Sequence, residues 1–147
     1  MTKAAVKFLQ AYFKAMMDFG NQDTSKAIST DLGAKLGKMY QKMNIVNFEK
    51  GLKKMYKVLK GKPKILKIDD KNYDVTITYK KPFCPIGGSW NIKIAKQFQD
   101  SVCIPYTQSF LNSFEPNYKF KGEIKKCILF NGTSFCKYKL HIEEEEQ

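Results

Sequence analysis

The chain has 147 residues, 43% of them hydrophobic and 14% aromatic, so it is long and apolar enough to bury a core and is not disordered. No apolar run reaches the roughly 18 residues that a membrane-spanning helix needs, and the N-terminus lacks the pattern of a signal peptide. We therefore expect one cytoplasmic domain over residues 1–147, with an N-terminal helix within 1–22 and an acidic tail at 143–147.

All the basic residues are lysines. There are 26 of them against 14 acidic residues, which gives a net charge of +12, and residues 35–81 alone hold 14 lysines and four acidic residues. Such a segment fits either a solvated exterior or a surface that binds a polyanion or an anionic membrane. The absence of arginine argues against sequence-specific DNA recognition, because bidentate arginine contacts to guanine are the commonest specific contacts.

Three amphipathic helices are predicted at the start of the chain. The first covers residues 3–19 and places Phe13 on its apolar stripe. The third begins after Asn47, a good N-cap residue, and ends before Gly61 and Pro63.

The second helix, which Asp23 or Thr24 can cap, contains two glycines one turn apart. Because glycine lowers helix propensity, we expect Gly33 and Gly37 to allow a close backbone contact with another helix, a partner subunit or a ligand. The apolar residues at helical spacing on this helix are Ile28, Leu32, Leu36, Met39 and Met43.

The middle of the chain is predicted to form a β-hairpin, a loop and two short helices. Residues 65–68 and 73–80 form the hairpin, the second strand with a period of two. The Pro- and Gly-containing stretch 82–88 is a loop. Ser89 is predicted to cap a fourth helix, and Pro105 to end that helix and begin a fifth.

A long hairpin is predicted for the last third, where apolar and polar residues alternate over 118–130 and 136–142 around an Asn-Gly turn. A two-residue turn would pair Cys127 with Cys136. A three-residue turn with a bulge would pair Ile128 with Cys136, and the hydrophobic pattern favours this second register. The order ααα-ββ-αα-ββ predicts an α+β fold, in which helices pack on a four-stranded antiparallel sheet.

Short motifs follow one another in a recognisable order in the second half of the chain. They are Val102-Cys103-Ile104-Pro105, Glu123-Ile-Lys-Lys-Cys127, the Asn131-Gly132 turn and Phe135-Cys136-Lys137-Tyr138. With the glycine-containing second helix, this order resembles the 4-vinyl reductase domain, whose superfamily also contains the transport-particle subunits. The resemblance covers about residues 24–142.

The resemblance implies a sheet-and-helix sandwich with an internal pocket for a small hydrophobic or aromatic ligand. It also implies a homodimer formed through the N-terminal helices, and a structural zinc held by three cysteines and a glutamate. Aromatic and methionine side chains are candidates for the pocket wall, although such residues also form ordinary cores. The candidates are Met39, Tyr40, Trp90, Phe98, Tyr106, Phe110, Phe114 and Tyr118.

Carried over from the resemblance, the zinc ligands would be Cys103, Glu123, Cys127 and Cys136. Three residues separate Glu123 from Cys127 where the family has two, which puts Glu123 about 13 Å away along a regular strand. Cys84 could be the fourth ligand instead. Cys103 lies two residues before Pro105, where the fifth helix is predicted to begin. The N-terminus of that helix would stabilise a thiolate at Cys103. The first alternative to a zinc site is that all four cysteines are buried, inert thiols. A further alternative is that they form disulfides or take part in redox chemistry.

No catalytic constellation is evident in the sequence. His141 is the only histidine and is expected on the outward face of the last strand, the acidic residues form no convincing pair, and Cys84 could serve as a nucleophile. We favour a stand-alone domain that binds a small hydrophobic ligand as a sensor or carrier. The first alternative is a transport-particle-like assembly subunit that docks an acidic partner or membrane through its lysine-rich surface. The second is an enzyme that uses a cysteine thiolate.

Overall fold

The computed structural model describes residues 3–19 and 22–145, except for the side chains of Lys3, Ala5, Val6 and Leu9. Four strands form one antiparallel sheet in the order β1-β2-β6-β5, and β3 pairs with β4, so the predicted α+β fold with a four-stranded sheet is confirmed. The elements are α1 (Lys3–Phe19), α2 (Gln22–Lys42), α3 (Phe48–Val58), β1 (Lys62–Lys67), β2 (Asn72–Thr78), β3 (Phe83–Cys84), β4 (Gly88–Ser89), α4 (Ile92–Phe98), the π-helical turn η1 (Gln99–Cys103), α5 (Ile104–Phe114), β5 (Tyr118–Lys126), α6 (Ile128–Asn131) and β6 (Phe135–Glu144).

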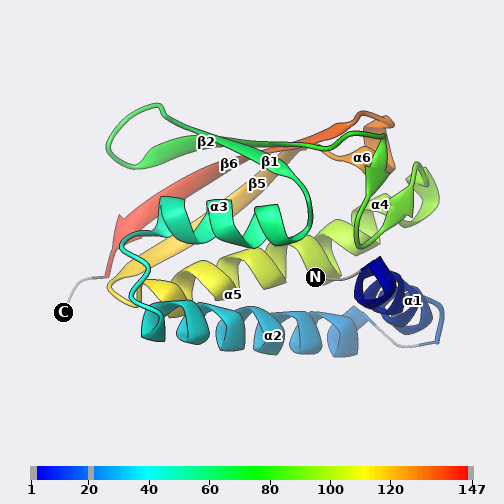
Figure 1. Cartoon of the computed structure of the whole chain (residues 1–147), viewed down its shortest axis with the longest axis horizontal. Coiled ribbons are helices and arrows are strands. Elements are labelled where there is room, and N and C mark those ends of the chain that lie inside the picture. The colour runs from blue at the N-terminus through cyan, green and yellow to red at the C-terminus, as the bar shows by residue number, and fades with distance from the viewer. Residues whose placement is uncertain (1–2, 20–21, 146–147) are drawn as a thin grey trace.

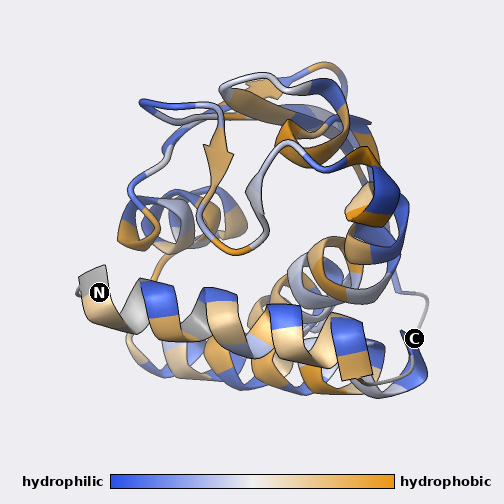
Figure 2. Cartoon of the chain, turned by 90° about the vertical axis from the view of Figure 1, so that its right-hand side faces the viewer, coloured by the Kyte–Doolittle hydropathy of each residue, from blue (hydrophilic) through white to orange (hydrophobic). Residues whose placement is uncertain are grey.

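The helices α3, α5 and α2 lie on the same side of the sheet (Figure 1). α3 and α5 pack against the strands, and α2 packs on α5 as a further layer. The main core lies between these layers and includes the fully buried Leu52, Val75 and Phe110. In Figure 2 the helices are banded hydrophilic and hydrophobic, as expected of amphipathic helices that cover a core.

The helix caps predicted from the sequence are partly confirmed. Asn47 caps α3, where its side chain accepts a hydrogen bond from the Lys50 amide at 3.0 Å. α2 begins at Gln22, so Asp23 and Thr24 lie inside its first turn and the predicted cap is wrong.

The buried face of α2 consists mainly of small residues. Ser25, Ser29, Gly33 and Gly37 are buried there and the two glycines face α5, while most of the predicted apolar stripe, such as Met39, is exposed. A Cβ on either glycine would collide with a backbone carbonyl of α5. The predicted close contact at the glycines is therefore confirmed, and its partner is another helix of the same chain.

One continuous helical stretch replaces the two predicted helices around Pro105. α4, η1 and α5 follow one another without a break, and the Ile104 amide bonds the Gln99 carbonyl through a π-type turn. Proline lacks an amide to donate, and the wide turn just before it accommodates this loss. Ser89 lies in β4 and does not cap α4, whose N-cap residue is Asn91.

The C-terminal hairpin has a register that neither prediction describes along its full length. Ile124 faces Tyr138, but Lys126 faces Lys137, because a β-bulge lies between Ile124 and Lys126. The extra residue keeps the apolar side chains of both strands on the inner face although the register differs on its two sides.

The strand predicted to run to residue 130 ends at Lys126. Residues 128–131 form α6, which closes on Gly132 at φ 68, a left-handed conformation that glycine adopts readily. The favoured pairing of Ile128 with Cys136 is therefore wrong. The register of a two-residue turn, which would pair Cys127 with Cys136, holds only for the last pair before α6, Lys126 with Lys137.

Candidate functional site

A cavity lies between the inner face of the sheet, α3, α5 and the segment around β3. Its volume is about 120 Å³. Most of the wall is apolar, and its apolar residues include Met55, Ile77, Ile86, Val102, Ile124 and Leu140. Thiol, hydroxyl and amide groups also line it, and Lys126 and Lys137 border it. A concave site of this composition is suited to an apolar ligand.

Some of the predicted ligand-binding residues lie at this cavity. Phe98 and Tyr106 form part of its wall. Tyr40, Phe110 and Phe114 lie in the main core, where their rings contact one another edge-on or stacked.

The other three predicted ligand-binding residues lie farther out. Tyr118 packs at the edge of the core, while Met39 and Trp90 are 51% and 57% exposed. The Trp90 indole donates a hydrogen bond to the Phe130 carbonyl at 3.1 Å, so it packs over the end of α6.

All four cysteines of the chain lie in the wall of the cavity and are free thiols. They come from four different places: Cys84 from β3, Cys103 from η1, Cys127 from the residue after β5, and Cys136 from β6. The predicted hairpin brings the last two together, and the family resemblance implied that Cys103, with Cys84 as a possible fourth ligand, lies near them.

Burial makes these thiols poor nucleophiles. It raises the pKa of Cys84, and it raises the pKa of Cys103 well above the ordinary range. It also raises the pKa of Cys136 to about 12, so these groups are protonated at neutral pH. The predicted stabilisation of a Cys103 thiolate by a helix N-terminus is wrong, because Cys103 lies within a continuous helical stretch.

Glu123 is directed away from the cavity. It faces Lys139 across the strands, and its carboxylate accepts a hydrogen bond from Lys125 at 2.6 Å, which lowers its pKa. Over residues 3–19 and 22–145, no three His, Cys, Asp or Glu side chains are grouped so that they could hold a metal ion. Glu123 therefore does not fit a zinc site shared with the cysteines, and zinc bound by the cysteines alone stays a prediction.

Three hydroxyl groups from separate elements meet at the cavity. The Tyr56 hydroxyl of α3 lies 3.0 Å from that of Tyr138 of β6, and the Thr107 side chain of α5 is close enough to Tyr56 to influence its pKa. Burial raises the pKa of both tyrosines, so both stay protonated. Sequence periodicity places each on a buried face, but nothing local indicates that they meet, since 82 residues separate the two tyrosines.

His141 lies on the outer side of the sheet, as the alternation predicted. Its Nδ1 is 2.9 Å from the Asn72 side-chain oxygen and its Nε2 is 3.1 Å from a Glu143 oxygen. Its register partner on β5 is Lys121, so it is placed among surface groups and away from the cysteines.

The chain has the fold of the transport-particle subunits. Along 99% of both chains it superposes, with a TM-score of 0.63 and 12% identity, on a trafficking protein particle complex subunit 3 from Naegleria fowleri, which is described as covalently bound to palmitic acid. No protein-family model matches the chain, and no curated protein matches it by sequence. The narrower resemblance to the 4-vinyl reductase domain stays a prediction. No helix among the described residues is long and apolar enough to cross a membrane.

Proposed function

We propose that this chain is an assembly subunit of the transport-particle kind that docks on an anionic partner through a lysine-rich surface. The observation that carries the proposal is a group of exposed lysines on α3, on β1 and between them. This group, the lysine surface, consists of Lys50, Lys53, Lys57, Lys60, Lys62 and Lys64.

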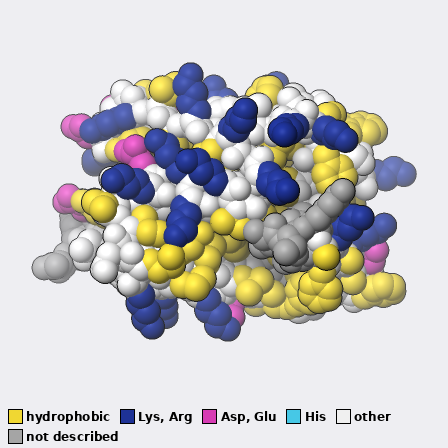
Figure 3. Space-filling model, viewed as in Figure 1, with side chains coloured by type: hydrophobic (Ala, Val, Ile, Leu, Met, Phe, Trp, Pro, Cys, Tyr) yellow, Lys and Arg dark blue, Asp and Glu magenta, His cyan; other side chains and the backbone are white. Residues whose placement is uncertain are grey.

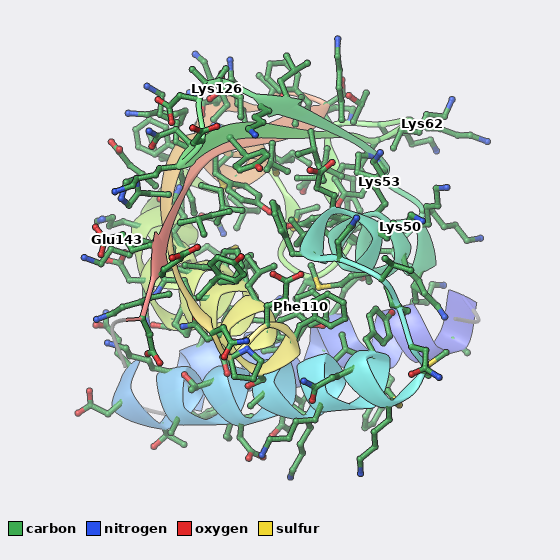
Figure 4. All side chains as sticks on the ribbon, turned by 90° about the vertical axis from the view of Figure 1, so that its left-hand side faces the viewer. Lys50, Lys53, Lys62, Phe110, Lys126 and Glu143 are labelled. Carbon is green, nitrogen blue, oxygen red and sulfur yellow. The ribbon has the colours of Figure 1, made fainter. Side chains whose placement is uncertain are left out.

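The charge of the lysine surface is not neutralised nearby. No ion pair to any of its members occurs within the described parts of the chain, whereas the neighbouring Lys67 pairs with Asp70 at 3.4 Å. In Figure 4, Lys50, Lys53 and Lys62 project from the same side of the molecule, and Figure 3 views that side face-on, with lysines spread over it. Such a surface attracts an acidic protein or an anionic membrane.

The test compares binding to phosphatidylserine vesicles and to polyglutamate at low salt. The triple variant Lys50→Gln, Lys53→Gln and Lys62→Gln should bind about 100-fold more weakly, at about 1 kcal/mol per lysine. A control variant with the same change of charge on the outer face of the sheet should bind nearly as well as the unchanged protein. An equal loss in both variants, or no binding by the unchanged protein, contradicts the proposal. The control changes Lys119, Lys121 and Lys139 to Gln.

We propose in addition that the cavity holds a small apolar molecule, so that the subunit also acts as a carrier or sensor. The apolar wall supports this, because removing hydrocarbon from water into such a site is favourable. The covalently bound palmitic acid of the similar subunit 3 is also consistent with an apolar occupant of this fold.

Gly122 offers a direct test of cavity binding. It lies in the cavity wall, and a Cβ built on it would meet no atom within 4 Å. Gly122→Leu should fill the cavity and weaken toluene binding about tenfold or more in an NMR titration. Lys121→Leu, at the neighbouring outward position, should change it by less than about twofold. Failure of the unchanged protein to bind toluene contradicts the proposal.

A second copy of the chain is the proposed partner for an apolar surface on α1 and α2. Phe8, Phe19 and Met39 are 74%, 91% and 51% exposed there, and Figure 3 shows hydrophobic side chains along the lower part of its view, where these helices lie. Residues 1, 2, 20 and 21 of the predicted dimerisation segment lie outside the described residues. Sedimentation equilibrium should give a dimer that Met39→Glu weakens and the control Gln41→Glu does not.

A further inference from the structure

We propose that the cavity selects an uncharged molecule that carries an oxygen atom, and that the hydroxyl groups of Tyr56, Thr107 and Tyr138 bind this oxygen. This inference rests on the proposed occupancy of the cavity by an apolar molecule and names the class of that molecule. It also names the residues that set the specificity.

The first argument is the number of hydrogen-bond donors in this cluster. Each hydroxyl carries one proton, and the hydrogen bond between Tyr56 and Tyr138 uses one of the three. No further partner of these three oxygens occurs among the described residues. Two protons and several lone pairs therefore remain at the cavity, where an alcohol or carbonyl oxygen can use them.

The second argument is the absence of a charged side chain directed into the cavity within the described parts of the chain. Lys126 and Lys137 are the charged residues that border it, and they face each other across β5 and β6. Tyr138 is buried on the inner face, so its neighbour Lys137, and with it Lys126, projects from the outer face. Figure 4 shows Lys126 on the outer side of the sheet, away from the helices.

The polar groups that do line the cavity are neutral. The thiols of Cys84, Cys103 and Cys136 and the two tyrosine hydroxyls remain protonated because burial disfavours their charged forms. A carboxylate or ammonium group that entered would lose its hydration without gaining a counter-charge. The site therefore discriminates against a charged head group and accepts a neutral one.

The size of the cavity sets the size of a suitable probe. A cavity of about 150 Å³ holds one benzene ring, and this cavity of about 120 Å³ is comparable. Toluene, benzyl alcohol and benzoate share one ring and differ only in having no polar group, a neutral hydroxyl or a charged carboxylate. They separate apolar binding, recognition of the oxygen and tolerance of charge.

The test measures the dissociation constants of the three probes by NMR titration. The unchanged protein should bind benzyl alcohol at least about tenfold more tightly than benzoate. Tyr56→Phe and Tyr138→Phe should each weaken benzyl alcohol about fivefold to tenfold and leave toluene within about twofold. Thr107→Val removes the third hydroxyl at nearly constant shape. Tyr118→Phe, which removes a hydroxyl at the edge of the core and outside the cavity wall, is the control.

The outcomes separate this inference from the proposed cavity function. Toluene binding without any loss of benzyl alcohol affinity in the three variants overturns the hydroxyl-cluster inference alone. Benzoate binding as tight as that of benzyl alcohol also overturns it. If neither toluene nor benzyl alcohol binds, the cavity function itself fails. Thermal unfolding midpoints near that of the unchanged protein establish that each variant is folded.

Discussion

Gly37 of α2 lies against the backbone of Phe110 in α5, so closely that a Cβ on the glycine would collide with the Phe110 carbonyl oxygen and come within 3.0 Å of the Phe114 amide nitrogen. Gly33 meets the carbonyl of Tyr106 one turn earlier in the same way. The two helices therefore approach at backbone distance, and α2 is held by close packing of small residues.

Alanine at either position should destabilise the protein. Gly33→Ala or Gly37→Ala would gain about 1 kcal/mol of helix propensity, but overpacking against backbone atoms costs about 1–3 kcal/mol or more. We expect a net loss of free energy of unfolding in urea titrations. Gly51→Ala in α3 is the control, because its Cβ would meet only side-chain atoms at 3.4 Å or more, and it should be neutral or stabilising. A stabilised Gly37→Ala variant would contradict the close approach.

Ser29 should be replaceable with a gain in stability. It is fully buried in α2, and its hydroxyl has no hydrogen-bond partner among the described residues. Removing an unsatisfied buried hydroxyl and improving helix propensity should raise the free energy of unfolding by about 1 kcal/mol in Ser29→Ala. Ser109→Ala is the comparison, because it removes the hydrogen bond that the Ser109 hydroxyl donates to the Thr30 carbonyl. This variant should have a lower free energy of unfolding. Similar losses in both variants would refute the assignment.

The stability of the variant Glu115→Gln relative to the unchanged protein should depend on pH. The Glu115 carboxylate accepts a hydrogen bond from the Phe48 amide at 3.0 Å, yet burial raises its pKa above the ordinary 4.5. Folding therefore favours the protonated form, and the contribution of this group to stability falls as the pH rises through the raised pKa. The variant has no charge to desolvate, so its relative stability should increase between about pH 4 and pH 7. A difference that is constant or decreases over this range argues against the assignment.

The cysteines should react slowly in the native protein. Because burial raises the pKa of Cys84, Cys103 and Cys136, alkylation by iodoacetamide should be at least about a hundredfold slower than in urea. Peptide mapping after timed quenching measures each site separately. One cysteine that reacts quickly under native conditions would support the enzyme hypothesis in place of a binding function.

Local signals in the sequence predicted the local structure well. Asn47 caps α3 because its side chain bonds an amide only three residues away. The period of two over 73–80 predicts β2, whose residues alternate between buried and less buried positions. Such features depend on neighbours in the sequence, so a single sequence contains the information for them.

Local signals in the sequence do not predict which face of α2 is buried. Hydrophobic periodicity selects the stripe with Leu32 and Met39, but small residues alone allow α5 to approach, so that stripe remains outside. The continuity through Pro105 was also missed, because a π-type turn absorbs the missing amide and no local signal predicts such a turn.

The cavity is the feature that the sequence predicted least. Phe98 and Tyr106 are the two pocket candidates that lie in its wall, whereas Tyr56 and Tyr138 are not among the candidates that the sequence offers. Their contact joins α3 to β6, and the cysteines reach the same cavity from four separate places. Long-range convergence of this kind requires the tertiary fold.

Occupancy of the cavity by an uncharged apolar molecule is tested most directly by native mass spectrometry of protein purified without chelator or oxidant. The predicted result is a mass that exceeds that of the polypeptide by one small organic molecule. This excess mass should disappear when the protein is unfolded in organic solvent, and a smaller fraction of the Gly122→Leu variant should carry the molecule. If the molecule stays attached after unfolding, it is covalently bound, as palmitic acid is in the similar subunit 3. A bare polypeptide mass, or an excess equal to zinc alone, would contradict the proposed cavity function.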